Sequence, residues 1–544
     1  MNLGLTRRAA LLAPLALAAC RGGAAASYDG AWVGASHERG HLLRKPAAPA
    51  APSVTKRCAV AIVGGGVAGL AAARALQRAG IDDVQLFELE DEAGGNARGH
   101  RMAGMACPLG AHYLPLPGPD AHEVSELLHE WGLLRNQFGR TVADERHLCH
   151  SPQERLWMAG QWIDGLLPPA ERGSVREQQY RRFADLVAEA SRKLGFALPT
   201  RRAAWTGGHA ALDAMTFAAW LAAQGLTDSG LRWYLDYACR DDYGAGSDVV
   251  SAWAGLHYFA SRHGFHAPGD ESAERDAVFT WPEGNAWITR KLSAPLGERL
   301  HSGLLVQRVQ VNRHEVELDV WSASAQRSEH WLAQQVVLAL PLHVAVRVVA
   351  QPPAALVDAA AQVPHAPWLV ANLHLRAPLT DKPGAAPSWD NVLYDPGDSD
   401  RAGRYALGYV DAMHQSLRPV AGPTVLTAYW ALGERDAAAL ARNRQALLTE
   451  PWEAWPRRVV DDLARAHPDL PAKVVRADLM RYGHAMAIPA PGVRGSAALR
   501  ALAEPEAGAR LYFAHSDLAG YSVFEEAFTL GDAAGSAAAK RFRS

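Results

Sequence analysis

Hydrophobic residues along the chain fall into short runs with two different spacings, and the most informative runs lie between residues 59 and 88. Residues 59–63, Ala-Val-Ala-Ile-Val, are apolar and rich in β-branched side chains, which predicts a buried parallel strand. Glycines interrupt this run, and an Ala/Leu-rich stretch then predicts a helix over residues 70–78. Residues 84–87 predict a second strand, which ends at Glu88. This order of elements is typical of a dinucleotide-binding βαβ unit.

The glycines of this unit have separate tasks. Gly64 permits the tight turn, Gly66 leaves room for a diphosphate beside the backbone, and Gly69 lets the helix and strand approach each other. The start of the helix, at Val67 and Ala68, offers free N–H groups and a positive partial charge to the phosphates. Glu88 follows about 20 residues later, where such a unit needs a carboxylate for a ribose hydroxyl.

Longer patterns follow this unit. Residues 121–280 are expected to be mostly helical, with helical spacing over residues 123–132 and 177–194, an apolar stretch at 218–224 and a hairpin at 155–162. An aromatic cluster between residues 233 and 259 either lines a pocket or packs in a core. Residues 369–375 alternate and predict a strand with Val370, Asn372 and His374 on one face.

Residues 88–98, Glu-Leu-Glu-Asp-Glu-Ala-Gly-Gly-Asn-Ala-Arg, resemble a signature of the two-dinucleotide-binding flavoproteins. This superfamily contains flavin amine oxidases, phytoene desaturases and protoporphyrinogen oxidase. The resemblance implies a permanently held FAD, with Gly94, Gly95 and Asn96 under its diphosphate. We interpret Glu90 and Glu92 as solvated charges. Gly110, Ala111 and His112 are similar to the strand end that faces the flavin in amine oxidases, although His112 has a purely structural reading as well.

Later segments resemble the remaining motifs of this superfamily, in the order that a discontinuous FAD domain requires. Residues 281–287 are similar to a turn near the flavin, and the strand at 304–309 corresponds to one that contacts the adenine around Val309. Residues 336–341 resemble the strand and proline that close this part of the domain. Asp517 is similar to the acid that binds the ribityl chain. Glu526 and Ala527 stand at the helix under the flavin, where Glu526 replaces a glycine.

The resemblance implies an α/β fold, with a discontinuous Rossmann-like FAD-binding domain and an α+β substrate domain that has a mixed sheet and a helical excursion. We expect the FAD-binding domain at residues 56–118, 281–345 and 504–544, and the substrate domain at 119–280 and 346–503. The length of 544 residues agrees with two domains. Residues 21–55 are expected to be an N-terminal segment that docks on the body, followed by an Ala/Pro linker.

The first twenty residues are predicted to be an export signal rather than part of the fold. Arg7 and Arg8 precede an apolar run, residues 9–19, that is too short to span a bilayer. Residues 17–20, Leu-Ala-Ala-Cys, resemble a bacterial lipobox. The pattern predicts export by the twin-arginine route and a periplasmic protein anchored to the membrane by a lipid on Cys20.

Composition limits the remaining possibilities. With a net charge of −2 and 21% charged residues, the chain gives no argument for a nucleic-acid partner, and the oligomeric state stays open. The histidines show no metal-ligand spacing, so we predict no metal. The four cysteines after Cys20 form no C-x-x-C pair, and we interpret them as buried free thiols.

The resemblance implies an amine substrate whose α-carbon gives a hydride to flavin N5, with imine hydrolysis and reoxidation by O2 to H2O2. Polyamines are plausible substrates. The family's strand lysine is missing, because position 370 is Val. The aromatic pair that frames the flavin is also altered, and the candidates to rebuild it are Tyr482, His484, Tyr521 and Phe524. We expect His484 to titrate near neutral pH beside the substrate amine, and Asn372 to position water or charge near N5.

Two other functions stay open from the sequence. The first is a flavin dehydrogenase or desaturase that acts on another apolar substrate and passes electrons to a quinone. The second is a non-catalytic flavin-fold protein of the cell envelope. Release of H2O2 that depends on an amine separates amine oxidation from the first, and failure of any substrate to bleach the flavin would favour the second.

Overall fold

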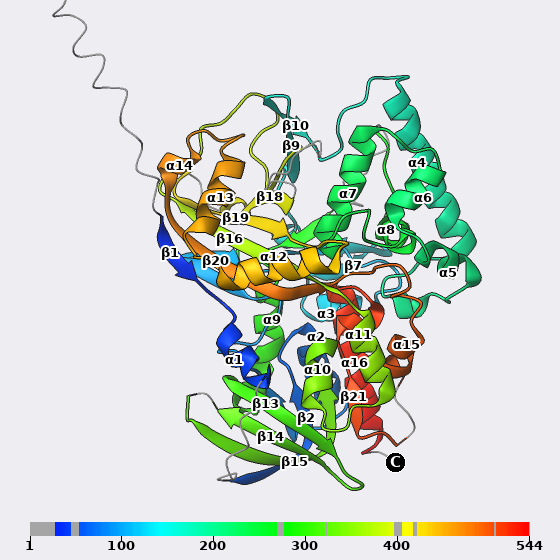
Figure 1. The fold of residues 1–544 in the computed structure, drawn as a ribbon, viewed down its shortest axis with the longest axis vertical. Helices are drawn as coiled ribbons and strands as arrows, with labels where there is room; N and C mark the ends of the chain where they lie inside the picture. Colours follow the sequence, from blue (N-terminus) through cyan, green and yellow to red (C-terminus); the bar gives the residue numbers. More distant parts are fainter. Residues whose placement is uncertain are drawn as a thin grey trace, which may run out of the picture.

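The computed structural model describes residues 28–44, 54–268, 277–322, 324–395, 405–416, 421–504 and 508–542. The predicted export signal with Cys20 and the Ala/Pro linker at residues 46–53 lie outside the described residues. The described chain builds two large sheets, one above the other in Figure 1. Among the described residues, none of the helices combines the length and the apolar character that a membrane span requires.

The lower sheet carries the dinucleotide unit at its centre. Its order is β12-β3-β2-β15-β14-β13, and β21 pairs with β15. The pairs among β12, β3, β2, β15 and β21 are parallel, whereas β13, β14 and β15 form an antiparallel meander. The bounds are β2 (Thr55–Val63), β3 (Val84–Phe87), β12 (Leu300–His301), β13 (Leu304–Val311), β14 (Val316–Ser322), β15 (Arg327–Leu338) and β21 (Leu511–Phe513).

Two helices beside this sheet pack closely against each other, because glycines on one of them leave room for the backbone of the other. A Cβ atom on Gly531 or Gly535 of α16 (Phe524–Lys540) would lie 2.1 Å from the carbonyl oxygen of Ala68 or 2.4 Å from that of Ala72, on α2 (Val67–Arg78). The two helices therefore touch along their backbones. This contact holds the last helix of the chain against the first helix of the dinucleotide unit. Other helices of the lower half are α3 (His122–Glu130), α9 (Ala286–Ser293), α10 (Leu342–Val348), α11 (Ala354–Gln362) and α15 (Ala497–Ala503).

The upper sheet is mixed and has eight strands in the order β1-β20-β16-β19-β18-β17-β9-β10. All residues of its inner strand β16 except His374 are buried, so both faces are covered rather than the single face that alternation suggests. The bounds are β1 (Asp29–Trp32), β9 (Glu154–Met158), β10 (Gln161–Asp164), β16 (His365–Leu375), β17 (Asp390–Leu393), β18 (Ala406–Asp411), β19 (Thr424–Ala431) and β20 (Val474–Ala487).

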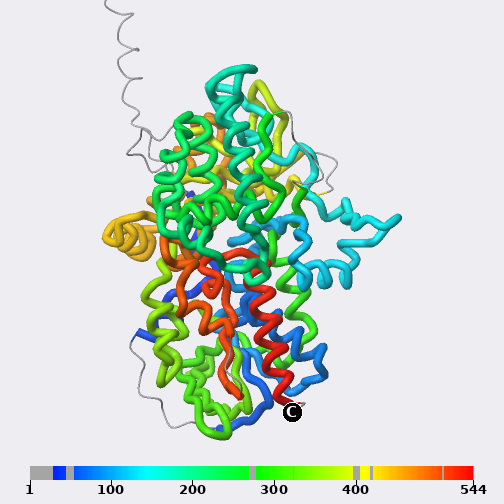
Figure 2. Tube along the Cα trace, turned by 90° about the vertical axis from the view of Figure 1, so that its right-hand side faces the viewer, coloured from blue at the N-terminus to red at the C-terminus, as the bar shows by residue number. Residues whose placement is uncertain are grey.

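Helices cover the upper sheet in two groups, which Figures 1 and 2 separate. One group is α12 (Ala437–Thr449), α13 (Ala454–Leu463) and α14 (Leu470–Lys473). The other is the expected helical excursion, α4 (Val175–Leu194), α5 (Gly207–Asp213), α6 (Phe217–Ala223), α7 (Ser229–Tyr243) and α8 (Ala252–Ala260). Three short two-stranded sheets stand apart from the two large ones: β4 (Gly99–Met102) with β5 (Met105–Pro108), β6 (Tyr113–Pro115) with β11 (Val278–Thr280), and β7 (Leu134–Gln137) with β8 (Arg140–Ala143).

Most elements predicted from the patterns are present. The helices expected at 70–78, 123–132 and 177–194 are α2, α3 and α4, and the hairpin at 155–162 is formed by β9 and β10. The N-terminal segment docks as β1 and α1 (His37–His41). Cys58, Cys107, Cys149 and Cys239 are free thiols, and all but the partly exposed Cys149 are buried. The domain boundaries stay predictions, because each sheet collects strands from separate parts of the chain.

Candidate functional site

One large cavity, of about 500 Å³, lies between the two sheets. It takes its walls from the glycine turn of the lower sheet, from the strands β16, β19 and β20 of the upper sheet, and from the start of α16. It brings together most residues that the sequence singled out: Gly64, Gly66, Val67, Ala68, Glu88, Gly94, Gly95, Asn96, Gly110, Ala111, His112, Tyr482, His484, Asp517 and Ala527.

The glycine turn has the geometry of a phosphate cradle. Gly64 has a φ of +102°, a left-handed conformation that favours glycine. A Cβ on Gly69 would meet the carbonyl oxygen of Gly64 at 1.9 Å, so this glycine permits the helix to approach the strand. A Cβ on Gly66, in contrast, would find only the Cα of Gly95 within 4 Å, at 3.8 Å. The space over Gly66 belongs to the cavity, where a diphosphate fits at the N-terminus of α2.

The carboxylate of Glu88 is held in place by the same turn. One oxygen accepts a hydrogen bond from the N–H of Gly65 at 2.7 Å, and the other accepts one from the N–H of Glu90 at 2.9 Å. The side chain is buried at the cavity wall, and burial raises its pKa. Arg98, which the motif contained but which was not singled out, lines the cavity beside Gly95, whose carbonyl accepts its Nε–H at 3.0 Å. It supplies a cation near the cradle.

Five residues singled out from the sequence do not line the cavity. Gly69 serves helix packing. Val309 is fully buried and its carbonyl accepts the N–H of Ala350 at 2.9 Å, whereas Val306 of the same strand lines the cavity. Asn372, Tyr521 and Glu526 lie behind the wall and bond to other parts of the protein.

The contacts of these last three residues explain their positions. The Asn372 amide donates to the carbonyl of Pro108 at 2.9 Å and accepts the Thr427 hydroxyl at 2.7 Å. Val370, two residues earlier on the same strand, lines the cavity instead. One carboxylate oxygen of Glu526 accepts the backbone N–H of Thr200 at 2.6 Å and the hydroxyl of Tyr521 at 2.9 Å. Its neighbour Glu525 lines the cavity. The acid at the cavity wall is therefore one residue earlier in the chain than we expected.

The expectation that Glu90 is a solvated charge is wrong. Its side chain is buried, and its carboxylate accepts the backbone N–H of Ser36 at 3.0 and 3.1 Å. The N-terminal segment covers it, which the local sequence around Glu90 could not reveal. Glu92 is exposed, as expected.

Aromatic side chains form the upper wall of the cavity. The ring of His112 stacks on Tyr429 with centroids 4.4 Å apart, and burial lowers the pKa of His112 to about 4. Tyr482 donates its hydroxyl to the carbonyl of Leu109 at 2.8 Å, and Tyr429 donates to that of Gly110 at 3.1 Å. These tyrosines present their rings rather than free hydroxyl groups. His112 is neutral at physiological pH, so it adds no positive charge to this wall.

Acidic side chains from the helical excursion complete the wall, and the sequence analysis missed them. Asp242 pairs with Arg262, whose Nη2 lies 3.2 Å from both carboxylate oxygens. Asp241 has the Tyr113 hydroxyl at 3.3 Å, and burial together with the charge of Asp242 raises its pKa to about 7. Glu525 also lines the cavity, where burial raises its pKa to about 7. The sequence offered one indication of these acids: Arg240, Asp241 and Asp242 are adjacent charges within a stretch rich in aromatic residues.

Histidines gather around Asp517. His365 lies 2.9 Å from one Asp517 oxygen, and the N–H of Leu342 donates to the same oxygen at 2.9 Å. Ligand-type atoms of His343, His365 and Asp517 all lie within 4.8 Å of one another. The sequence spacing of these residues gives no hint of the cluster, because they come from three separate segments. The prediction of no metal stays a prediction.

The fold and the cavity define a class, the oxidoreductases that bind FAD between a dinucleotide-binding half and a substrate-binding half. Residues 67–537 match the family model described as flavin containing amine oxidoreductase, and the chain belongs to this family. Its cofactor is FAD. The cradle over Gly66, the buried Glu88 carboxylate and the cation of Arg98 fit that dinucleotide.

Individual relatives are more distant. A putative flavin-containing monoamine oxidase, AofH, from Mycobacterium tuberculosis is 29% identical over 288 residues, which are 52% of this chain and 56% of the relative. The chain therefore spans about half the length of this curated relative. Polyamine oxidase 7 from Oryza sativa subsp. japonica is 34% identical over 149 residues, 25% of this chain and 31% of the relative.

Solved structures share the fold over nearly the whole chain. Cyclohexylamine oxidase from Brevibacterium oxydans gives a TM-score of 0.63 at 18% identity, covering 90% of this chain and 100% of that one. Putrescine oxidase bound to putrescine gives 0.59 at 18% identity, with the same coverage. At this level of identity the likeness shows the fold alone.

Proposed function

We propose that this protein is a FAD-dependent amine oxidase whose substrates carry a second positively charged nitrogen, as diamines and polyamines do. The observation that carries the proposal is the place of Asp241 in the cavity wall. Its neighbour Asp242 has a cationic partner in Arg262, whereas the hydrogen bond described for the Asp241 side chain comes from the uncharged Tyr113 hydroxyl.

Electrostatics support a cationic ligand at this position. Burial raises the pKa of Asp241 to about 7, and the pKa of the partly exposed Asp390 nearby is also raised well above its usual value. Carboxyl groups in such a setting gain from an opposite charge within a few ångströms, because it stabilises their ionised form. A substrate ammonium group would supply that charge. The neutral His112 on the same wall does not oppose it.

The other residues of the cavity wall surround the amine that is oxidised, at the opposite end of the substrate from the nitrogen held by Asp241. Bound FAD supplies the two-electron acceptor for a hydride from the substrate α-carbon. The rings of Tyr429, Tyr482 and Trp368 line the cavity, and they would limit the access of water to a substrate bound there. With one nitrogen held at Asp241, a flexible chain is restricted at one end, which lowers the entropic cost of placing the other amine. Val370 stands where the resemblance leads one to expect lysine, so this wall leaves the reacting nitrogen without a like charge beside it.

The test compares two amines of matched length. Asp241→Asn is expected to raise KM for 1,4-diaminobutane at least tenfold, about 1.4 kcal/mol, and to leave KM for butylamine within about twofold. In the parent, KM for the diamine should fall as pH rises through 7, because Asp241 ionises, and this dependence should weaken in the variant, in which Glu525 is the remaining acid that titrates near pH 7 at the cavity wall. Asp185→Asn, on the exposed side of α4, is the matched control. Equal effects on both amines would contradict the proposed role of Asp241.

We propose O2 as the electron acceptor. Anaerobic addition of diamine should bleach the flavin absorbance, and admission of air should restore it with one H2O2 for each amine oxidised. Bleaching that is reversed by a soluble quinone but not by air would favour the dehydrogenase instead. No bleaching by any amine would favour a non-catalytic protein.

We also propose export by the twin-arginine route and anchoring by a lipid on Cys20. Arg7-Arg8, the short apolar run and the lipobox-like residues 17–20 support this. Replacing both arginines with lysine should retain the protein in the cytoplasm. Cys20→Ala should release it from the membrane fraction, and a cytoplasmic parent protein would contradict both parts.

A further inference from the structure

The segment 28–44 precedes the dinucleotide unit and lies across both halves of the molecule. Its first part, β1, pairs in parallel with β20, so that Asp29 stands opposite Arg476 and Trp32 opposite Leu479. The N–H of Val33 continues this pairing by donating to the carbonyl of Leu479 at 2.8 Å. The guanidinium of Arg481 lies 4.5 Å from the Trp32 ring centroid and stabilises the attachment to the upper sheet.

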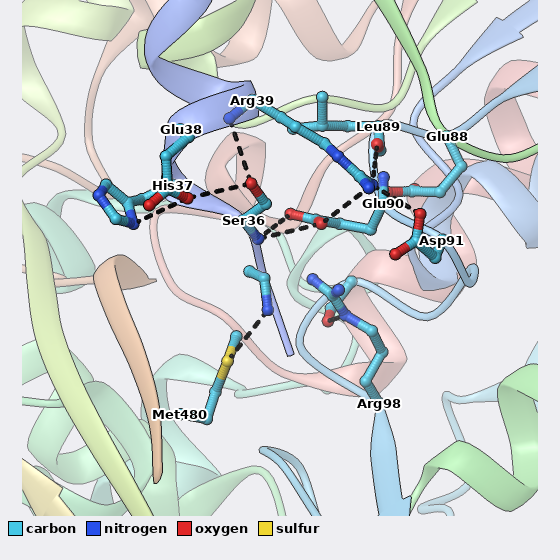
Figure 3. Close-up of polar contacts among 12 residues, drawn as sticks. Ser36, His37, Glu38, Arg39, Glu88, Leu89, Glu90, Asp91, Arg98 and Met480 are labelled. Carbon is cyan, nitrogen blue, oxygen red and sulfur yellow. Dashed lines mark hydrogen bonds and ion pairs between the residues drawn. The ribbon is translucent and has the colours of Figure 1, made fainter. Parts of the chain in front are cut away.

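The second part of the segment binds the loop that follows the ribose acid Glu88 (Figure 3). The N–H of Ser36 points at the carboxylate of Glu90 and donates to both of its oxygens, at 3.0 and 3.1 Å. Arg39 reaches over the same loop, with Nη1 2.7 Å from Asp91 Oδ1 and 3.4 Å from the carbonyl of Leu89. Glu90 is buried, so Ser36 provides a hydrogen bond that this carboxylate cannot take from bulk water.

The third part of the segment reaches the cofactor cavity. Gly40, in α1, and Leu43, in the short 3-10 turn Leu42–Arg44, both line it. The loop that the segment binds also lines it, through Glu88, Leu89 and Glu90. The N–H of Glu90 holds one oxygen of Glu88. One short segment is therefore tied to the upper sheet, to the ribose-acid loop and to the cavity at the same time.

We propose that residues 28–44 form a cofactor clamp, which slows the dissociation of FAD by closing its cavity at the ribose-acid loop. The clamp lies outside residues 67–537, which match the family model. FAD passes this part of the wall only when the bonds of Ser36 and Arg39 open. Loss of these bonds therefore raises the rate of FAD release.

The first test removes the N–H that binds Glu90. Ser36→Pro deletes the donor, and the φ of Ser36, −87°, lies close to the range of proline. Ser36→Ala keeps the N–H and loses only the hydroxyl that caps α1. After dilution of the flavin-loaded full chain to nanomolar concentration, the rise of free-flavin fluorescence gives the release rate. We expect at least a fivefold faster release from Ser36→Pro than from Ser36→Ala.

The second test reverses the ion pair and needs no change of backbone. Arg39→Asp and Asp91→Arg should each accelerate FAD release two- to fivefold. The double variant should recover part of the loss from the Asp91 ion pair, since Arg39 also pairs with Glu90 at 3.9 Å. Arg181→Asp breaks an exposed ion pair with Glu177 on α4 and serves as the matched control, with unchanged release. Amide hydrogen exchange of residues 28–44 should also be slower with FAD bound than without it.

The two tests separate a clamp from a simple structural brace. A brace would lower the melting temperature of the variants while FAD leaves at the parent rate, and that result would overturn the proposal. Parent-like release from Ser36→Pro and from both charge reversals would do the same. The readout is flavin release, so the outcome does not depend on which amine the enzyme oxidises.

Discussion

The imidazole rings of His343 and His484 are stacked, with centroids 4.3 Å apart and planes inclined by 25°. Burial lowers the pKa of His343 to about 3 and holds that of His484 far below its usual value, and each ring disfavours a positive charge on the other. His484 is therefore neutral over the pH range in which enzymes work. From the sequence we expected His484 to titrate near neutral pH beside the substrate amine, and its lowered pKa does not agree with that role.

This pair predicts a loss of stability in mild acid. The pKa values in the folded state lie below the unfolded value of about 6.5, so the unfolded chain binds more protons as pH falls below that value. The contribution is fully present above pH 6.5 and decreases as pH falls, by at most about 2 kcal/mol per histidine at pH 5. Chemical denaturation from pH 7 to 5 measures the slope.

Two variants check the assignment of this slope. His484→Gln keeps a polar side chain without a titrating group and should flatten the decrease in unfolding free energy. His314→Gln, at an exposed position, should leave it unchanged. A slope that is the same in the parent and in His484→Gln would show that His484 does not contribute.

A second prediction separates the two kinds of glycine in the dinucleotide unit. Gly66→Val places a side chain in the cavity without a protein atom in its way, so the protein should fold and fail to bind FAD. Gly69→Val would meet the carbonyl of Gly64 at 1.9 Å from its Cβ and should prevent stable folding. Circular dichroism and flavin absorbance distinguish the outcomes. A yellow Gly66→Val protein would contradict the location of the diphosphate.

The sequence could predict the residues whose role depends on local backbone. Gly64, Gly66 and Glu88 belong to one continuous βαβ unit, and their spacing is set by the turn, the helix and the strand between them. The alternation of strand 369–375 placed Val370 and Asn372 on one face correctly, but the cavity ends between them. The edge of a cavity depends on residues from other strands. The sequence of a single strand does not show which residues these are.

The acids of the site and the clamp were beyond the reach of local patterns. Asp241 lies at the cavity wall on α7, and its hydrogen-bond partner Tyr113 stands 128 residues earlier in the chain. Glu90 is buried because Ser36 lies on it, 54 residues before it. Helical spacing could not decide between Glu525 and Glu526, because the two are adjacent and the direction of α16 is set by its packing on α2.

A third prediction concerns Asn372, whose amide is bonded within the protein and is fully buried. Asn372→Ala should leave the carbonyl of Pro108 and the hydroxyl of Thr427 without these partners and lower the unfolding free energy by about 1–3 kcal/mol. Reoxidation of the reduced flavin by oxygen should proceed at the parent rate, because the residue does not line the cavity. When Thr427→Val is combined with Asn372→Ala, the loss of unfolding free energy should be smaller than the sum of the two single losses, because the two side chains share a hydrogen bond. Slow reoxidation with unchanged stability would return Asn372 to the site.

The last prediction concerns the two adjacent acids at the start of α16. Glu526 accepts hydrogen bonds from Thr200 and Tyr521, so Glu526→Ala leaves the buried N–H of Thr200 without this acceptor and should lower the unfolding free energy by about 1–3 kcal/mol. Glu526→Gln keeps an acceptor and should recover most of this loss. Neither variant should change how the flavin absorbance depends on pH, because Glu526 faces away from the cavity.

Glu525 should behave in the opposite way. Burial raises its pKa to about 7 while Arg262 acts to lower it, so its charge changes near neutral pH at the cavity wall. A charge that appears there as pH rises should shift the absorption bands of bound FAD, with a midpoint near pH 7. Glu525→Gln should abolish this shift, since a neutral side chain then faces the cavity at every pH, and the melting temperature should change little. Titration of the flavin spectrum in both variants decides the assignment, and a shift that survives Glu525→Gln but is lost in Glu526→Gln would reverse it.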